Sequence, residues 1–194
     1  MSITNSKKES IGKEKNKAII LDRDGVLIHD IGYVHKVEDF RFIPKAVDAL
    51  KLLSQKGFKL IIITNQSGIG RGYYTKEDFL KFNNHLINEL SKNKIKIEKT
   101  YYCPHHPDES CNCRKPSTRH AEEAKKEFNI DLKRSYVIGD HPSDIEMGKK
   151  AGCKAAYVLT GHGKKHKGQA KAADFIAEDL YDAAKWIVSR ERKD

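Results

Sequence analysis

Two aspartates early in the chain could carry chemistry together. Asp22 and Asp24 follow a short apolar stretch in the sequence Asp-Arg-Asp-Gly. In an extended chain, residues two apart point to the same side, so both carboxylates could face one cation. Carboxylates this close repel each other unless one is protonated or a divalent ion lies between them, and oxygen ligands suit Mg²⁺. An Asp-Gly turn with a second, solvated aspartate would explain the same residues without chemistry.

Three further segments could complete a site around these carboxylates. Residues 64–68 place a hydroxyl and two amides beside a glycine, a pattern that can cradle phosphoryl oxygens. Residues 114–116, Arg-Lys-Pro, add two cations. Asp140 ends another apolar stretch, and Asp144 follows four residues later.

A second cluster combines cysteine and histidine. Cys103, His105, Cys111 and Cys113 supply three thiolates and an imidazole, which make a complete tetrahedral shell for a structural Zn²⁺. His106 is a rival ligand, and reduced thiols on a surface loop are the alternative interpretation. The remaining cysteine, at position 153, lies in an apolar stretch and is expected in the core.

The elements that would position these residues alternate between strand and helix. Apolar and β-branched stretches predict strands over 17–22, 58–64, 95–102, 135–139 and 155–159. Amphipathic stretches predict helices from Pro44 to Gly57 and over 75–92, 118–128, 143–151 and 178–190. This alternation predicts an α/β fold, a Rossmann-like doubly wound parallel sheet with helices on both faces. Ligands bind beyond the carboxyl ends of such strands, where Asp22, Thr64 and Asp140 would meet.

Length and hydropathy bound the organisation of the chain. The 194 residues fit one domain, expected over 17–194 after a polar, flexible leader over 1–16. No insertion is long enough to indicate a large cap domain. The longest apolar runs, such as 60–63, are far shorter than the ~20 residues that cross a bilayer, and no secretory signal is visible. We therefore expect a cytoplasmic protein with no membrane partner.

The chain is basic, with net charge +10 from 37 Lys and Arg against 27 Asp and Glu. Much of the excess lies in residues 7–17 and 164–171, which lack the interleaved aromatics that stack on exposed bases. We interpret these lysines as solvated, expect no nucleic-acid partner, and expect a monomer.

The order and spacing of the segments resemble the motifs of haloacid-dehalogenase-type hydrolases, namely DxDG, a threonine after a strand, a lysine, and GDxxxD. A longer set is similar to the heptose 1,7-bisphosphate 7-phosphatases, which serve lipopolysaccharide core synthesis in Gram-negative bacteria. It covers about residues 18–160 and consists of DRDGV, GYVH, TNQSGIGRG, YYCPHHP, CNCRKP and VIGD.

The resemblance implies a role for each residue of the first site. Asp22 would be the nucleophile that forms an aspartyl-phosphate, and Asp24 the general acid and base. Thr64 and Lys115 would hold the transferring oxygens. Mg²⁺ would be bound by Asp22, the backbone carbonyl of Asp24, and Asp140. Asp144 would orient the lysine, or would simply be a favourable charge at a helix N-terminus.

The resemblance also implies a phosphorylated sugar substrate and a zinc loop that holds Arg114 and Lys115 in place, with Cys103, His105, Cys111 and Cys113 as ligands. The expected substrate-binding residues are Asp30, Gly32, Tyr33, Asn65, Gln66, Arg114 and His141. Two features depart from the heptose enzymes and concern substrate identity. His141 stands where those enzymes commonly have a lysine, and residues 117–119, Ser-Thr-Arg, stand where a Pro-Gly-containing segment is frequent.

Other functions use the same residues. A histidinol-phosphate phosphatase would share the site and the Cys/His loop. A nucleic-acid 3′-phosphatase would need a basic groove leading to Asp22, and a zinc-stabilised binding module would need no intact catalytic set.

Overall fold

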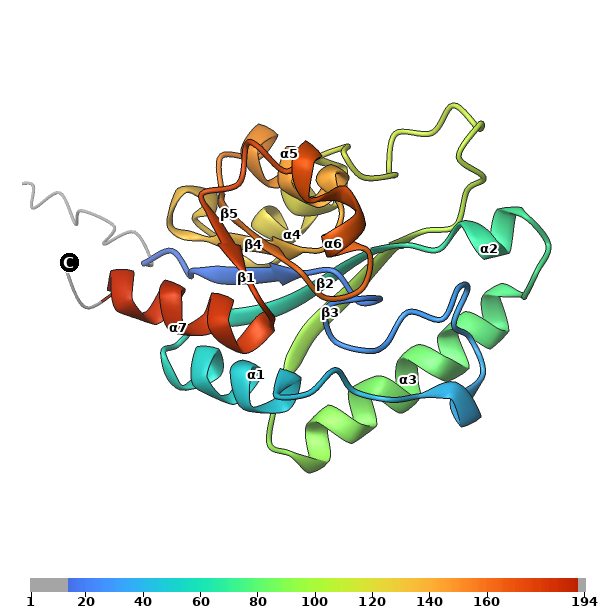
Figure 1. The fold of residues 1–194 in the computed structure, drawn as a ribbon, viewed down its shortest axis with the longest axis horizontal. Helices are drawn as coiled ribbons and strands as arrows, with labels where there is room; N and C mark the ends of the chain where they lie inside the picture. The colour runs from blue at the N-terminus through green and yellow to red at the C-terminus, as the bar shows by residue number, and fades with distance from the viewer. Residues whose placement is uncertain (1–13, 192–194) are drawn as a thin grey trace, which may run out of the picture.

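The computed structural model describes residues 14–191, which form an α/β fold around one six-stranded parallel sheet (Figure 1). The strand order is β3-β2-β1-β4-β5-β6. The strands are β1 Ala18–Leu21, β2 Lys59–Asn65, β3 Ile97–Cys103, β4 Tyr136–Gly139, β5 Lys154–Val158 and β6 Phe175–Ala177. The five predicted strands are thus confirmed to within about two residues, and β6 was not predicted. Of the predicted leader, residues 1–13 lie outside the described part, whereas Asn16 bridges to Ile130.

The sheet is buried on both faces, as the continuous apolar strands predicted. Every residue of β1 is buried, and Ile20 at its centre pairs with Ile61 of β2 and Val137 of β4. Parallel strands in such sheets are covered by helices on either side, which explains why their sequences do not alternate between apolar and polar.

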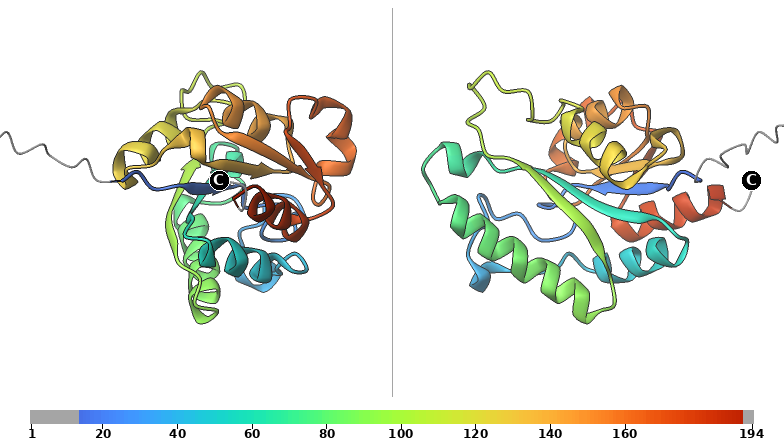
Figure 2. Two further views of the ribbon diagram at one scale, coloured as in Figure 1. Left: turned by 90° about the vertical axis from the view of Figure 1, so that its left-hand side faces the viewer. Right: turned by 180° about the vertical axis from the view of Figure 1, so that it is seen from behind.

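Helices lie in two layers, one on each face of the sheet (Figure 2). Helices α1 (Ala46–Gln55), α3 (Lys76–Lys92) and α7 (Leu180–Glu191) share one core cluster with the sheet. Helices α4 (Arg119–Phe128) and α5 (Pro142–Lys150) share the second. The five predicted helices are therefore confirmed. The sequence did not indicate the short helices α2 (Ser67–Gly70) and α6 (Gly163–His166), nor the 3₁₀ turns Val37–Asp39, Leu132–Arg134 and Lys167–Gln169.

Local side-chain chemistry determines where two of the helices begin. The Thr75 side chain accepts a hydrogen bond from Asp78 N, and the Asp78 carboxylate accepts one from Thr75 N, so α3 begins with a capping box. Helix α5 begins in the same way with His141 and Asp144, and Pro142 occupies its first turn. The second of these caps lies beside β4, at the edge where the site was predicted.

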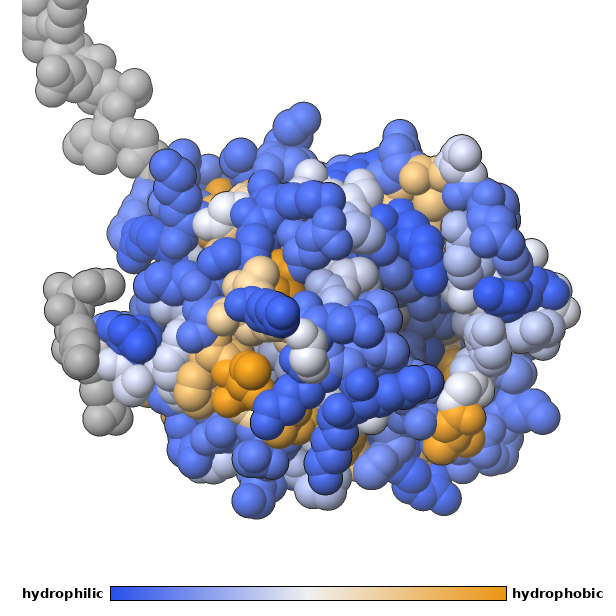
Figure 3. Space-filling view, turned by 45° about the horizontal axis from the view of Figure 1, so that its top comes forward, coloured by the Kyte–Doolittle hydropathy of each residue, from blue (hydrophilic) through white to orange (hydrophobic). Residues whose placement is uncertain are grey.

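The topology creates one switch point, between β1 and β4. From β1 the chain proceeds outward to β2 and β3 on one side, and β4, β5 and β6 occupy the other. Ligands bind to doubly wound sheets at this point. Within residues 14–191 no large cap domain covers this edge (Figure 1), and no helix there is both long and apolar enough to cross a membrane. The face in Figure 3 is predominantly hydrophilic, with small hydrophobic patches.

Candidate active site

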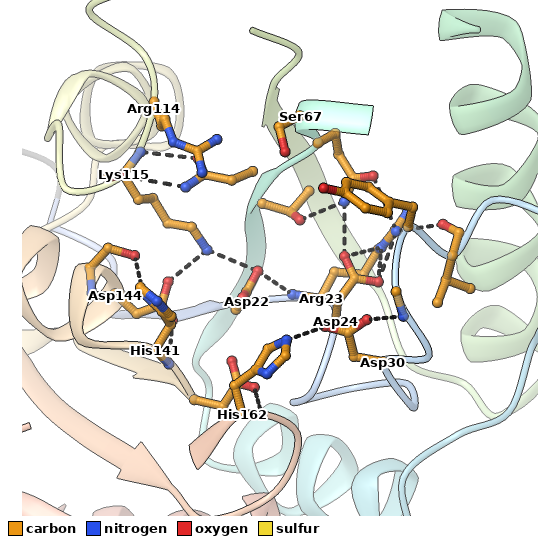
Figure 4. Close-up of a pocket in the computed structure, with 18 of the residues that line it drawn as sticks. Asp22, Arg23, Asp24, Asp30, Ser67, Arg114, Lys115, His141, Asp144 and His162 are labelled. Carbon is orange, nitrogen blue, oxygen red and sulfur yellow. Dashed lines mark hydrogen bonds and ion pairs between the residues drawn. The ribbon is translucent and has the colours of Figure 1, made fainter. Parts of the chain in front are cut away.

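Three carboxylates meet at the switch point. Asp22 directly follows β1, Asp140 directly follows β4, and Asp144 lies in the first turn of α5. One oxygen atom from each lies within 4.8 Å of the other two. Figure 4 shows Asp22 and Asp144, with the Lys115 side chain reaching toward both. Asp140 and Asp144 are buried, and Asp22 is only partly accessible. The sheet therefore brings together residues that are more than a hundred positions apart in the sequence, as their strand-end positions predicted.

The electrostatics of this cluster fit a divalent cation. Burial, together with the charges of the neighbouring Asp22 and Asp144, raises the pKa of Asp140 to about 8. Burial also raises the pKa of Asp22, against the opposing effect of Lys115. Buried carboxylates that disfavour one another's charge are stabilised as anions by a bound metal ion, and three oxygen donors suit Mg²⁺.

Two glycines keep space beside Asp140. A Cβ atom on Gly25 or on Gly161 would lie 2.1 Å from Asp140 Oδ2. The same oxygen accepts a hydrogen bond of 2.7 Å from the backbone N–H of His162.

The Asp24 carboxylate lies outside the cluster of three carboxylates because it binds Arg23 and Gln66. Only the backbone carbonyl of Asp24 is therefore left to bind a metal ion.

Lys115 forms ion pairs with two of the three carboxylates, those of Asp22 and Asp144. Its ammonium lies 2.8 Å from Asp22 Oδ1 and 2.6 Å from Asp144 Oδ1, and it donates a 2.9 Å hydrogen bond to Ile63 O. Burial lowers the pKa of Lys115, but the two carboxylates together raise it above its ordinary value. The lysine therefore keeps its positive charge beside Asp22, where a phosphoryl group would develop negative charge.

Asp144 serves both purposes that the sequence left open. One oxygen pairs with Lys115, and the other accepts a 3.0 Å hydrogen bond from His141 N at the start of α5. Gly139 allows this close approach, because a Cβ there would lie 2.2 Å from the Asp144 Cβ.

Asn65 holds the backbone that carries Lys115. Its Oδ1 accepts a 3.0 Å hydrogen bond from Lys115 N, and its amide group lies 3.4 Å from Lys115 O. Because β2 ends here, the lysine is tied to the same sheet edge as the carboxylates. Asn65 lines the cavity as predicted, but its side chain binds the Arg-Lys loop.

Asp24 belongs to a buried polar network. Its carboxylate accepts hydrogen bonds from the Arg23 guanidinium, at 2.8 Å to Nη2, and from Gln66 Nε2, at 2.9 Å. Gln66 also contacts Thr64 Oγ1 and the Tyr74 hydroxyl. Arg23 is fully buried, with its guanidinium over the rings of Phe79 and Phe82.

A cavity of about 520 Å³ opens over these groups. All seven residues predicted to bind substrate line it, together with the predicted catalytic residues. They are Asp30, Gly32, Tyr33, Asn65, Gln66, Arg114 and His141, with Asp22, Asp24, Thr64, Lys115 and Asp140. The sequence reasoning missed Tyr74 and His162. His162 Nε2 lies 3.1 Å from Asp30 Oδ2, which joins the loops on two sides of the cavity. Neither residue stands at a strand end or in a charged motif, so no local signal pointed to them.

The Cys/His cluster forms a compact second site. One ligand atom from each of Cys103, His105, Cys111 and Cys113 lies within 4.8 Å of the other three. Sulfur atoms are 3.7 Å apart for Cys103 and Cys111 and 3.9 Å apart for Cys111 and Cys113. Tetrahedral Zn²⁺ with ~2.3 Å bonds to sulfur would place its thiolates about 3.8 Å apart. The donor set and its spacing therefore fit a closed structural zinc.

His106 does not join this cluster. Its Nδ1 accepts a 3.2 Å hydrogen bond from Asp108 N and lies 3.4 Å from the Asp108 carboxylate. The ring is therefore directed toward its own turn, and His105 is the histidine of the cluster. Cys153 is buried with apolar side chains, as predicted.

Comparison with known proteins shows which family has this arrangement. Residues 19–96 match the family model described as haloacid dehalogenase-like hydrolase, and residues 112–183 match a HAD-hydrolase-like model. The chain is 38% identical over 185 residues to the D-glycero-beta-D-manno-heptose-1,7-bisphosphate 7-phosphatase of Haemophilus influenzae, covering 92% of this chain and all of that one. The chain belongs to the haloacid dehalogenase-like hydrolases, within the heptose-1,7-bisphosphate 7-phosphatase group. It is therefore an enzyme, a phosphatase.

Two further relatives extend the comparison. The D-glycero-alpha-D-manno-heptose-1,7-bisphosphate 7-phosphatase of Photorhabdus laumondii is 40% identical over 156 residues, covering 76% of this chain and 85% of that one. The solved structure of the D,D-heptose 1,7-bisphosphate phosphatase from B. bronchiseptica, complexed with magnesium and phosphate, superimposes with a TM-score of 0.83 at 28% identity. That comparison covers 90% of this chain and 99% of the other.

Proposed function

We propose that this phosphatase removes the 7-phosphate of D-glycero-D-manno-heptose 1,7-bisphosphate through an aspartyl-phosphate on Asp22. The observation that carries the proposal is the group of three carboxylates and one lysine beneath an open cavity. The relatives of this chain are named as heptose-1,7-bisphosphate 7-phosphatases. The product would enter lipopolysaccharide core synthesis.

The first half of the reaction transfers the phosphoryl group to the protein. An Asp22 carboxylate oxygen forms a bond to phosphorus, and the bond from phosphorus to the sugar O7 breaks. Asp24 gives its proton to that oxygen as the sugar leaves. Lys115 and Thr64 hold the transferring oxygens, and Asp144 keeps the lysine in place. Asp22, Asp140 and the backbone carbonyl of Asp24 would hold Mg²⁺, which would supply positive charge to the phosphoryl group.

The second half restores the enzyme. Asp24, now a carboxylate, takes a proton from a water molecule that attacks the phosphorus. The bond between Asp22 and phosphorus breaks, inorganic phosphate is released, and both aspartates return to their starting states. The residues that bind the transferred phosphoryl group thus act in both halves of the reaction.

Arg114 and His141 lie at the cavity where the second phosphate of a bisphosphate could be held. Burial lowers the pKa of His141, helped by His166, so this imidazole is even less charged than an ordinary histidine and much less than a lysine. Its Nδ1 accepts a 3.3 Å hydrogen bond from Ser143 N, so the neutral ring carries its proton on Nε2 and can still donate. Arg114 therefore supplies most of the positive charge for that phosphate, and His141 a directed hydrogen bond.

The remaining expectations also stand as proposals. A cytoplasmic location fits the four unpaired cysteines, since reduced thiols and zinc sites persist in reducing compartments. A monomer fits the described surface, on which large exposed apolar side chains are few. Nucleic acid is not expected as substrate, and light scattering and subcellular fractionation test the other two points.

The test is phosphate release, with Mg²⁺ and with chelator, from the heptose bisphosphate in both anomers, histidinol phosphate and a 3′-phosphorylated oligonucleotide. We expect the highest kcat/KM for the heptose, and the ratio between anomers decides which named relative this enzyme follows. Higher kcat/KM on either rival would keep the chemistry of Asp22 and overturn the substrate. Asp22→Asn is expected to lower kcat by at least about 10³-fold, and a variant with unchanged turnover would exclude the covalent route.

A further inference from the structure

The Gln66 side chain is almost fully buried, and all four of its hydrogen-bonding positions are occupied. Its Oε1 accepts from the Tyr74 hydroxyl at 2.7 Å and from Arg23 Nη2 at 3.2 Å. Its Nε2 donates to Asp24 Oδ2 and to Thr64 Oγ1, both at 2.9 Å. An amide has two lone pairs and two N–H groups, so these contacts leave none for a sugar hydroxyl.

The chemistry of the neighbours determines which way the amide faces. Arginine can only donate hydrogen bonds, so the atom facing Arg23 must be the amide oxygen. The NH₂ group at the other end of the amide therefore faces Asp24 and Thr64. The orientation of Gln66 therefore follows from the chemistry of its partners.

This orientation affects both residues on the NH₂ side. Thr64 Oγ1 accepts a hydrogen bond from Gln66, so the threonine's own hydrogen is left to donate elsewhere, and Thr64 lines the cavity. Asp24 receives a donor that, with Arg23, holds its carboxylate in one place. One amide thus orients a group that contacts the phosphoryl oxygens and the group that exchanges protons with the leaving oxygen and water.

Tyr74 holds the oxygen of the Gln66 amide in place. Its ring stacks on His35 with centroids 4.6 Å apart, and Gly68 lies so close that a Cβ there would be 2.1 Å from Tyr74 Cε1. Burial raises the pKa of Tyr74 to about 12, so its hydroxyl keeps the proton that it donates to Gln66.

We propose that Gln66, held by Tyr74 and Arg23, is a positioning residue that fixes Asp24 for proton transfer and turns the Thr64 hydroxyl hydrogen toward the phosphoryl group. The inference rests on the proposed acid–base role of Asp24. It differs from the sequence expectation, in which Gln66 binds the sugar directly.

The test compares two leaving groups. The sugar oxygen of the heptose bisphosphate needs a proton when it leaves, whereas the phenolate of 4-nitrophenyl phosphate leaves without one. Gln66→Met keeps the size of the side chain and removes its hydrogen bonds. We expect kcat on the heptose to fall at least about tenfold more than kcat on the aryl phosphate, with KM for the heptose changed less than about twofold. A higher KM with unchanged kcat, or equal losses on both substrates, would overturn the inference.

Asp24→Asn separates this inference from the assignment beneath it. It should show the same leaving-group dependence in stronger form, because general acid catalysis contributes about 10²–10⁴-fold. If Asp24→Asn shows no such dependence, the acid–base role fails and the inference with it. If Asp24→Asn shows it and Gln66→Met does not, the inference alone fails.

Tyr74→Phe gives a second test that keeps the ring and removes one hydroxyl. We expect a leaving-group dependence of about threefold, and no added effect when it is combined with Gln66→Met, because Tyr74 acts through the amide. Tyr73→Phe is the matched control, since Tyr73 is exposed and packs against the Tyr33 ring. An equal effect of the two substitutions, or additive effects in the double variant, would contradict the role of Tyr74.

Discussion

The two clusters of metal-binding side chains are assembled in opposite ways. The thiols and imidazole come from a single loop, residues 103–113, whereas the carboxylates come from residues 22, 140 and 144 and meet only because the sheet folds. The Cys/His set is a complete four-ligand shell. The three carboxylates line the 520 Å³ cavity, and Lys115 lies beside them. This site is therefore open to a substrate. The local cluster can maintain structure, and the distant one can carry out chemistry.

The clusters are linked through the Arg-Lys segment. Cys113 is two residues from Lys115, whose ammonium contacts Asp22 and Asp144. The loop is also packed against α2, where Gly70 N donates a 2.8 Å hydrogen bond to Pro104 O. Disrupting the zinc loop should therefore move the lysine and leave the carboxylates where the sheet places them.

Among the changes that test this comparison, breaking the local cluster is expected to have the largest effect. Cys113→Ser should abolish zinc binding, lower the melting temperature by several degrees, and lower kcat by about 10²-fold, because a small displacement of a positioned group costs about that much. The Mg²⁺ concentration for half-maximal activity should stay within about threefold, since the carboxylates are not in the loop. Zinc content by atomic absorption and Mg²⁺ titrations of activity provide the measurements.

Cys153→Ala is the matched control for that prediction. It also removes a buried thiol, but one that lies in the apolar core away from the cluster. We expect it to retain one zinc per chain and nearly full activity. A Cys113→Ser protein that loses zinc and keeps its kcat would show that the two clusters are independent.

The next effect separates the two contacts of Asp144. Asp144→Asn keeps an oxygen that can accept from His141 N, but it removes the negative charge that pairs with Lys115. We expect kcat to fall by about 10- to 100-fold, as is typical for a residue that orients a site residue. Steady-state kinetics with the heptose bisphosphate would measure this.

Asp78→Asn is the control, because Asp78 holds the same position in the capping box of α3 but is only partly buried and does not line the 520 Å³ cavity. It should leave kcat unchanged and lower the melting temperature slightly. If the two substitutions have equal effects on kcat and on melting temperature, Asp144 acts as a helix cap alone.

The sequence allowed prediction of the residues whose roles follow from local pattern. Asp22 and Asp140 end apolar strands, and parallel strands bring their carboxyl ends to one edge. The Cys/His ligands lie within one loop, so their spacing alone indicated a metal site. The strands themselves were visible because burial on both faces makes them continuously apolar.

The contacts of the amides could not be predicted, because they depend on tertiary neighbours. Asn65 and Gln66 look alike in a polar segment, yet Asn65 binds the Lys115 backbone and Gln66 binds Asp24. Tyr74 resembles any aromatic residue before a helix, and β6 has only three residues in a polar region, too few to show a period.

The smallest expected effect concerns the space beside Asp140. Gly161→Ala would place a Cβ 2.1 Å from Asp140 Oδ2 and 2.5 Å from Gly25 Cα, at a residue with φ of +52°. We expect the carboxylate to shift and the Mg²⁺ concentration for half-maximal activity to rise by about tenfold, in addition to a loss of stability. Magnesium titrations of phosphate release measure the first effect, and thermal unfolding measures the second.

Gly152→Ala isolates the backbone part of that effect. Gly152 has φ of +85°, and a Cβ there would meet nothing within 4 Å. Its cost should be about 1–2 kcal/mol of left-handed strain, with no change in the Mg²⁺ requirement. Both variants should thus lower the melting temperature, and only Gly161→Ala should alter magnesium dependence. Equal magnesium dependence in the two variants would mean that Asp140 tolerates the added methyl group. The carboxylate site would then hold its cation less rigidly than the close approach of Gly25 and Gly161 to Asp140 implies.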